Sequence, residues 1–223
     1  MLLIYTPKIT NRHRYIFNVF FNEIYQLDYQ VTDDIEFYSS YNSGKINYSK
    51  SPISDNEFFI ESHSLLDEKG INEQLIEVSV FDELPIFFQT SSSSSLPFDV
   101  FAASFYLITR YEEYLPHIKD EYGRFRASES LAFNSNFLEK PLVNIWAKYL
   151  FSELKRIFPF IDFTKSEFRF ISTIDIDAAY KFKHKGFVRT CANILRYCYN
   201  RKIDMLSFML LVFFGRRKEN SIK

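Results

Sequence analysis

Cysteine is scarce in this sequence. The 223 residues contain only two, Cys191 and Cys198. Their spacing matches no metal-binding or redox motif, so we interpret them as ordinary reduced thiols on one face of a helix. This cysteine usage fits a reducing compartment.

Long apolar runs are also absent. No stretch reaches the 18 apolar residues expected of a transmembrane helix, and residues 205–214 give a run of only about ten. The N-terminal sequence "MLLIYTPKITNRHRYIF" has no basic region ahead of its short apolar run, which excludes a typical signal peptide. We therefore predict a cytoplasmic location, with contact at the inner membrane face left open.

The chain as a whole has almost no net charge, but its C-terminal segment is strongly basic and the remainder is acidic. The formal net charge is −1. Residues 181–223 hold 11 Lys and Arg against 2 Asp and Glu, so the tail carries +9 and the rest of the chain −10. The neutral total hides a basic C-terminal segment.

The composition is that of a folded protein. Hydrophobic residues make up 47% of the chain and aromatic residues 19%, so a sizeable core is expected and disorder of the bulk is not. The length suggests one large domain or two small ones.

The first part of the chain alternates short segments of strand and helix character. Residues 2–6 predict a strand that Pro7 ends, and apolar residues at helical spacing predict a helix over 11–27 with Asn11 as its N-cap. Aromatic and β-branched residues between turn signals predict further strands. These strands are "YQVTD" (29–33), "IEFYSS" (35–40), "KINYS" (45–49), "EFFIES" (57–62), "LIEVSVF" (75–81) and "LPIFFQ" (84–89).

Two stronger helices follow a serine-rich linker or loop at 90–97. They are predicted over 97–115 and 141–158, each opened by a proline. We therefore expect an α/β fold, with a mixed sheet and packed helices over 1–115. A helical connection is expected over 116–165.

The sequence "FRFISTIDIDAAY" (168–180) combines an apolar pattern with two aspartates. We predict a strand from Phe168 to about Asp177, which places Asp175 and Asp177 on one face, roughly 6.6 Å apart along the backbone. Such a pair can bind a divalent metal and take a proton from its bound water. A solvated strand end is the plainer alternative.

Several phrases of the sequence, in order, resemble a known arrangement of domains. "TIDID" (173–177) resembles the first motif of the NodB-like polysaccharide deacetylases of carbohydrate esterase family four. "LPFDVFAASFYLITRYEEYLPHIKDEYGRFRASESLAF" and "FLEKPLVNIWAKYL" resemble the domain of unknown function that precedes such deacetylases in certain bacterial proteins. The resemblance covers about residues 1–190.

The resemblance implies a metal-dependent hydrolase of acetyl groups on a polysaccharide or oligosaccharide. It implies that residues 166–223 begin a NodB-like (β/α) barrel, that Asp175 is the catalytic base and that Asp177 binds the metal, with zinc as the usual ion. The H-x-x-x-H pair of that family is missing here. We therefore expect a truncated catalytic domain that is inactive and binds no metal tightly by itself, so that enzymatic activity stays uncertain.

The basic tail suggests an alternative of another class. Residues 186–220 predict one or two basic amphipathic helices, which could bind an anionic membrane surface or a protein partner without any enzymatic role. No nucleic-acid-binding motif accompanies the charge, so we expect no such partner. An insertion helix packed within a longer protein is the third reading. The residues expected at the membrane or partner surface are Lys181, Lys183, Lys185, Arg189, Arg216 and Arg217.

Two shorter stretches are further candidates. "RYEEY" (110–114) predicts a surface pair between Arg110 and Glu113, with a domain contact as the functional alternative. "DEYGRF" (120–125) predicts a turn at Gly123 with Tyr122 and Phe125 packed back onto the protein, and a role in substrate binding is the functional alternative.

Overall fold

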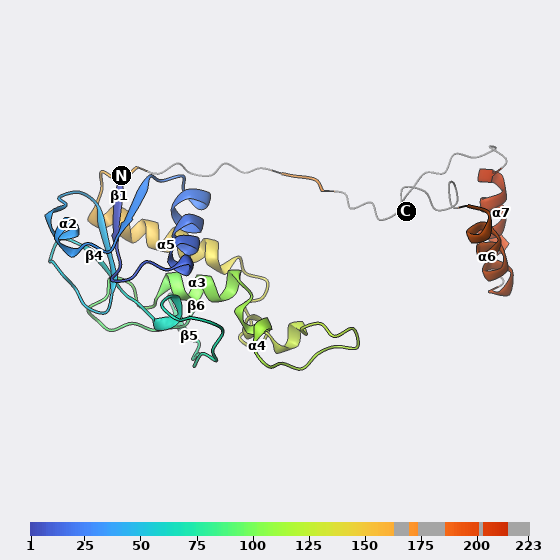
Figure 1. Cartoon of the computed structure of the whole chain (residues 1–223), viewed down its shortest axis with the longest axis horizontal. Coiled ribbons are helices and arrows are strands. Elements are labelled where there is room, and N and C mark those ends of the chain that lie inside the picture. Colours follow the sequence, from blue (N-terminus) through green and yellow to red (C-terminus); the bar gives the residue numbers. More distant parts are fainter. Residues whose placement is uncertain (163–169, 174–185, 201–202, 214–223) are drawn as a thin grey trace. The chain divides into compact units, whose positions relative to one another are not determined.

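The computed structural model describes residues 1–162, 170–173, 186–200 and 203–213. Contacts divide the chain into two units, residues 1–167 and 168–223, which are described separately (Figure 1). The contacts group residues 116–167 with the N-terminal part, whereas the sequence suggests a separate connection over 116–165. The helix that those residues supply lies in the core of the first unit.

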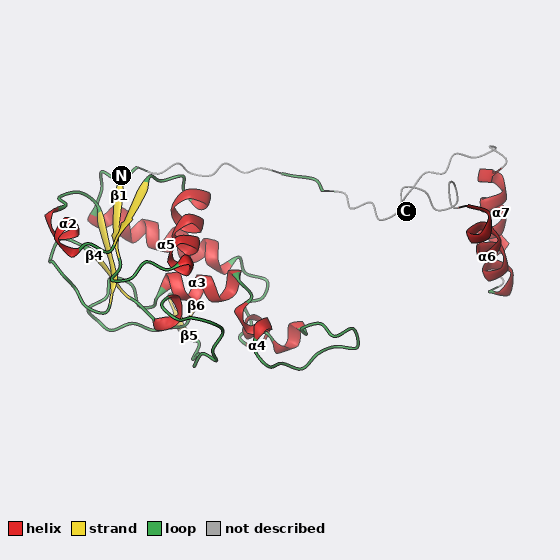
Figure 2. Cartoon of the chain, in the orientation of Figure 1, coloured by secondary structure: helices red, strands yellow, loops and turns green. Residues whose placement is uncertain are grey.

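A four-stranded parallel sheet organises the first unit (Figure 2). Its order is β2 (Tyr29–Thr32), β1 (Leu2–Tyr5), β3 (Lys45–Ser49) and β4 (Phe58–Glu61). The predicted strands at these four places are confirmed. The prediction of a mixed sheet is wrong, because all three pairings are parallel.

A separate antiparallel hairpin accounts for the last two predicted strands. It consists of β5 (Ser79–Phe81) and β6 (Leu84–Ile86). The two residues between them, Asp82 and Glu83, both have positive φ, as a tight two-residue hairpin turn requires.

The first helical segment is α1 (Asn11–Phe17), continued by the π-helix η1 (Asn18–Ile24). Thr10, not the predicted Asn11, is the N-cap. The Thr10 hydroxyl accepts a hydrogen bond from the His13 backbone N–H (3.2 Å), and the Thr10 backbone N–H donates to His13 Nδ1 (3.2 Å). This reciprocal pair satisfies two amide groups at the helix start.

Residues 35–40 form the helix α2 (Ile35–Ser40), so the strand predicted there is wrong. The carboxylate of Asp34 accepts hydrogen bonds from the backbone N–H groups of Glu36 and Phe37 (2.9 and 3.0 Å). This N-cap starts a helix in a segment whose aromatic content favours a strand.

The longer helices are α3 (Val100–Ile108) and α5 (Leu142–Ile157), which pack against each other and against α1 and η1. With the sheet they enclose the main core, where the Trp146 indole N–H donates to the Pro85 carbonyl (3.1 Å). The predicted helix over 141–158 is confirmed. The one over 97–115 is shorter, since Asp99 caps its start and Arg110 adopts a left-handed conformation after its end.

The opposite face of the sheet carries a small cluster of Leu3, Tyr5 and Tyr38. The chain from β3 to β4 returns beside this cluster through residues 50–57, which is short for a parallel connection. Its fold is fixed by the buried carboxylate of Glu57. Hydrogen-bond donors come from the Tyr38 hydroxyl (2.9 Å), the Asn47 amide (2.9 Å) and the Ile53 N–H (2.7 Å).

The serine-rich segment 90–97 is an ordered loop against the edge strand β4. The Phe59 N–H donates to Ser95 Oγ (3.1 Å) and the Glu61 N–H to Ser94 Oγ (3.2 Å), while the Ser95 N–H donates to the Phe59 carbonyl (2.7 Å). These bonds occupy backbone groups that an edge strand otherwise leaves open.

Shorter elements complete the first unit. They are η2 (Ser64–Leu66), η3 (Tyr111–Tyr114), η4 (Ala127–Glu129) and α4 (Leu131–Asn134).

The second unit contains α6 (Gly186–Tyr199) and α7 (Ile203–Phe213), which contact each other. The predicted tail helices are confirmed over these ranges. None of the described helices has both the length and the apolar character needed to cross a bilayer. Likewise, the described residues form no barrel.

Candidate functional site

The predicted catalytic pair, Asp175 and Asp177, lies outside the described residues. Residues 170–173, just before it, form no strand, and the side chains of Phe170 and Ile171 are exposed. The predicted strand from Phe168 is therefore wrong over 170–173, where Phe170 and Ile171 are 84% and 78% exposed instead of buried in a sheet. The roles of the two aspartates stay predictions.

Most of the predicted basic surface also lies outside the described residues. This holds for Lys181, Lys183, Lys185, Arg216 and Arg217. Arg189 is described, and its exposed side chain lies on α6.

The helix α6 presents an apolar stripe beside its arginines. Val188, Leu195 and Tyr199 are 82%, 71% and 89% exposed, and their spacing places them on one face. Arg189 and Arg196 each follow a residue of the stripe in sequence, so they lie together about 100° around the helix from it. Other residues of α6 pack toward α7, where Met209 is buried.

Histidines of the first unit occupy separate structural positions. His13 is buried, and its Nε2 lies 4.0 Å from Asp67 Oδ1. Burial, helped by the nearby Lys8 ammonium, lowers the pKa of His13 to about 4, so the contact with Asp67 is not an ion pair near neutral pH. His63 stacks on Phe88 with ring centroids 3.9 Å apart.

The described part of the chain contains no cluster of three His, Cys, Asp or Glu side chains suited to a metal ion. His63 Nδ1 accepts a hydrogen bond from the Leu65 N–H (3.3 Å), and His117 Nδ1 lies 2.8 Å from the Leu115 carbonyl oxygen. These ring nitrogens already have backbone partners.

Asp99 is a buried carboxylate that sequence reasoning missed. It accepts hydrogen bonds from the Tyr48 hydroxyl (2.7 Å) and from the N–H groups of His63 (2.6 Å), Phe101 (3.0 Å) and Ala102 (2.9 Å). Burial raises the pKa of Asp99 to about 6, and the four donors oppose the shift. Asp99 thus joins β3, the end of β4 and the start of α3, which is a structural task.

The "RYEEY" stretch borders a groove of about 510 Å³. The predicted ion pair between Arg110 and Glu113 is confirmed. Glu112 accepts a hydrogen bond from the Leu131 N–H (2.9 Å), and burial raises the pKa of its carboxyl group. The groove therefore lies between the end of α3 and the segments around α4. Its wall includes Leu107, Arg110, Glu112, Phe125, Ser130 and Leu142.

The "DEYGRF" stretch forms the predicted turn. Gly123 has a positive φ, and Asp120 accepts hydrogen bonds from the backbone N–H groups of Tyr122 and Arg124 (both 2.8 Å). Phe125 packs back as predicted and borders the groove. Tyr122 does not, because its ring is 71% exposed beneath the Arg124 guanidinium.

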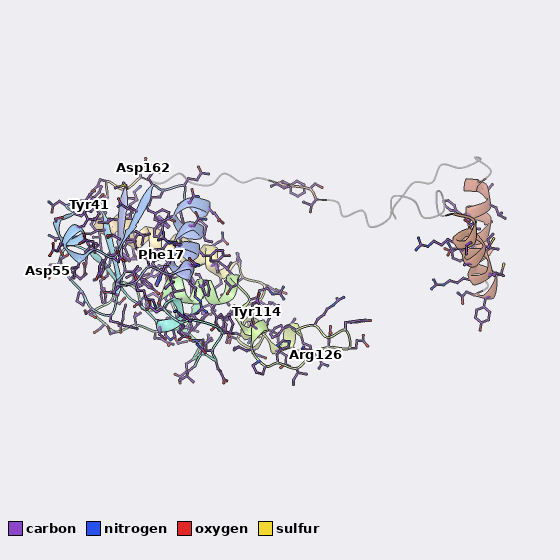
Figure 3. The ribbon with its side chains drawn as sticks, viewed as in Figure 1. Phe17, Tyr41, Asp55, Tyr114, Arg126 and Asp162 are labelled. Carbon is purple, nitrogen blue, oxygen red and sulfur yellow. The ribbon has the colours of Figure 1, made fainter. Side chains whose placement is uncertain are left out.

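A second hollow, of about 550 Å³, opens at the amino end of β3. Tyr41 and Asp55 border it, and Figure 3 shows both at the end of the first unit away from Tyr114 and Arg126. Sequence reasoning missed this hollow. The only signal for it was Lys45, a charged residue in the otherwise strand-like "KINYS" segment.

These features define the first unit as an α/β domain with a four-stranded parallel sheet and no metal centre among its described residues. Residues 2–159 match a family of unknown function, DUF7033. The chain belongs to this family. No curated protein and no solved structure matches it.

Proposed function

We propose that the DUF7033 unit is the non-catalytic N-terminal module of a metal-dependent carbohydrate deacetylase-like protein. The observation that carries the proposal is the position of "TIDID" at 173–177. It follows the family match, which ends at residue 159, and the first compact unit, which ends at 167. The resemblance to the deacetylase motif thus concerns residues beyond the DUF7033 domain.

In this proposal Asp175 is the general base and Asp177 is a metal ligand. A catalytic zinc site takes three protein ligands. The described histidines do not complete it, because His13 is buried within its capping bonds and His63 lies stacked on Phe88. Further ligands must come from elsewhere, so we derive no reaction step through a metal.

Acetate release from an acetylated sugar oligomer tests this proposal. The natural gene product, with its coding DNA read past Lys223 and its intact mass measured, is assayed after chelation and after zinc is returned. We expect zinc-dependent release, with Asp175→Asn lowering the rate by about 10²-fold or more. Asp204→Asn, at an exposed position of α7, is the matched control. Full activity of Asp175→Asn, or no acetate release by the natural product, would refute the proposal.

A second candidate is a membrane-surface role for α6 and α7. It is supported by the apolar stripe of Val188, Leu195 and Tyr199 beside Arg189 and Arg196. An exposed apolar stripe next to cations suits the boundary of an anionic bilayer. A cytoplasmic protein at the inner membrane face could then meet a lipid-linked or oligosaccharide precursor, which would reconcile the two candidates.

Vesicle sedimentation tests the second candidate. We expect the chain to pellet with phosphatidylserine vesicles but not with phosphatidylcholine vesicles, and less so at high salt. Leu195→Asp should abolish binding, whereas Leu75→Asp, at a still more exposed leucine of the first unit (87% against 71%), should not. Equal binding by both variants would exclude this role for the stripe.

A further inference from the structure

The hollow at the amino edge of the sheet is bordered by a buried lysine for which the described residues supply no anionic partner. Lys45, the first residue of β3, is 5% exposed and borders the hollow. Among the described residues, no carboxylate lies within ion-pair distance of its ammonium group. Its Nζ makes a cation–π contact with the ring of Tyr38, whose centroid is 5.0 Å away.

This arrangement is costly for the empty protein. A buried charge is tolerated when it is paired or well hydrogen-bonded, and a cation–π contact compensates only part of the lost hydration. The buried carboxylate of Glu57, which accepts the hydrogen bond of the Tyr38 hydroxyl, also accepts hydrogen bonds from the Asn47 amide and the Ile53 N–H. An acidic group on a ligand in the hollow would supply the anion that Lys45 lacks among the described residues.

The rest of the wall is rich in groups that bind hydroxyls. Three short segments supply it: residues 39–45 after α2, residues 54–56 before β4, and residues 157–160 at the end of α5. Asn42 and Asn56 offer amide donors and acceptors, and Asp55 offers a carboxylate acceptor. An apolar ligand would leave these groups unpaired, at a cost in binding free energy.

Aromatic side chains form another part of the same wall. They are Tyr41, Phe158 and Phe160. The Tyr41 hydroxyl donates to the Met1 carbonyl (3.0 Å), which fixes the ring in place, whereas Phe160 is largely exposed. Their flat apolar faces suit the C–H face of a ring compound, while the polar groups suit its edge. The volume, about 550 Å³, is typical of small-molecule sites.

We propose that this hollow binds a sugar that carries an acidic group, with the acid on Lys45, the hydroxyls on Asn42, Asp55 and Asn56, and the ring against Tyr41 and Phe160. The acid can be a carboxylate or a phosphate, since both accept charge-assisted hydrogen bonds from an ammonium group. The proposal goes beyond the proposed deacetylase role, because it concerns residues of the first unit alone and requires neither Asp175 nor Asp177.

Calorimetric titration of the full chain with three probes tests the site. The probes are glucuronate, glucose 6-phosphate and glucose. We expect at least one of the two acidic sugars to bind about tenfold or more tightly than glucose. The acid that binds identifies the group that Lys45 receives. Failure of both acids to bind at about 10 mM, or equal affinity for glucose, would overturn the proposal.

Two variants assign the binding to this hollow. Lys45→Met keeps the length of the side chain and removes its charge, and should weaken binding of the acidic sugar by about tenfold or more while leaving the weak binding of glucose unchanged. Phe160→Ala, at an exposed position, should weaken the binding of every sugar that binds. Lys148→Met, on the exposed side of α5, is the matched control. Unchanged affinity in folded Lys45→Met, checked by its thermal transition, would show that Lys45 has a structural role only.

Discussion

At one end of the parallel sheet the buried carboxylate of Asp99 accepts four hydrogen bonds, whereas at the other end the buried ammonium of Lys45 lies over the ring of Tyr38 and has no carboxylate partner among the described residues. Both side chains are nearly inaccessible to water. The two residues are different kinds of buried charge. The partners of Asp99 lie within the fold, whereas the anionic partner that we propose for Lys45 is a ligand. We regard the first as structural and the second as a ligand site.

The largest expected effect on the free energy of unfolding comes from substitution of Asp99, the buried charge with four hydrogen-bond donors. Asp99→Ala removes the N-cap of α3 and leaves the Tyr48 hydroxyl and the His63 N–H without an acceptor. We expect the free energy of unfolding to fall by about 3 kcal/mol or more. Urea denaturation measures it, with the exposed Asp55→Ala as control. If Asp99→Ala lowers the free energy of unfolding no more than Asp55→Ala does, Asp99 does not have the structural role that distinguishes it from Lys45.

The pH dependence of stability gives the next largest effect. The pKa of His13 is lowered to about 4 from an unfolded value of 6.5, so its contribution is present above pH 6.5 and is lost as the pH falls toward 4. At 1.36 kcal/mol per pKa unit, the loss is about 3 kcal/mol. Asp99 opposes it, because its raised pKa gives stability that is present below pH 3.8 and lost as the pH rises to about 6.

A variant separates these two contributions. The stability advantage of the wild type over His13→Gln should shrink by about 3 kcal/mol between pH 7 and pH 4, because Asp99 is common to both proteins. Denaturation curves at the two pH values measure this change. A constant advantage would mean that folding does not lower the pKa of His13.

Substitution of Lys45 should change the free energy of unfolding less than substitution of Asp99, and in the opposite direction. Lys45→Met should leave the free energy of unfolding unchanged or raise it by about 1 kcal/mol, since it removes a buried charge at the expense of the contact with the Tyr38 ring. The same urea titration applies. A loss above about 2 kcal/mol would indicate that Lys45 is as structural as Asp99.

The smallest effect is expected at the exposed wall of the hollow. Phe160→Ala should change the free energy of unfolding by less than about 0.5 kcal/mol, because its ring is largely exposed. Thermal or urea denaturation measures it. A larger loss would mean that the ring supports the fold rather than a ligand.

Periodicity in the sequence predicted much of the fold for identifiable reasons. The strands β1, β3 and β4 have dense apolar or aromatic residues, and α5 has a clear apolar face behind Pro141. The helix α2 was missed because one capping aspartate, Asp34, outweighed the aromatic content of the segment. The parallel pairing is long-range and leaves no local pattern.

The candidate site was less accessible to sequence reasoning. The hollow joins residues around 42, 55 and 160, which are far apart in the chain and become neighbours only through packing. Lys45 lies in a segment predicted as a strand and Asp99 in one predicted as a helix, and neither pattern indicates a buried charge. Asp175 and Asp177 were chosen from a motif, and their assignment still rests on that motif.

Amide chemical-shift mapping during titration of the full chain with glucuronate and glucose 6-phosphate tests the central claim most directly. The account predicts that at least one acidic sugar shifts signals of residues 39–45, 54–56 and 157–160, and that Lys45→Met loses these shifts. Shifts confined to the groove near Arg110 and Glu112, or no shifts with either sugar, would contradict it.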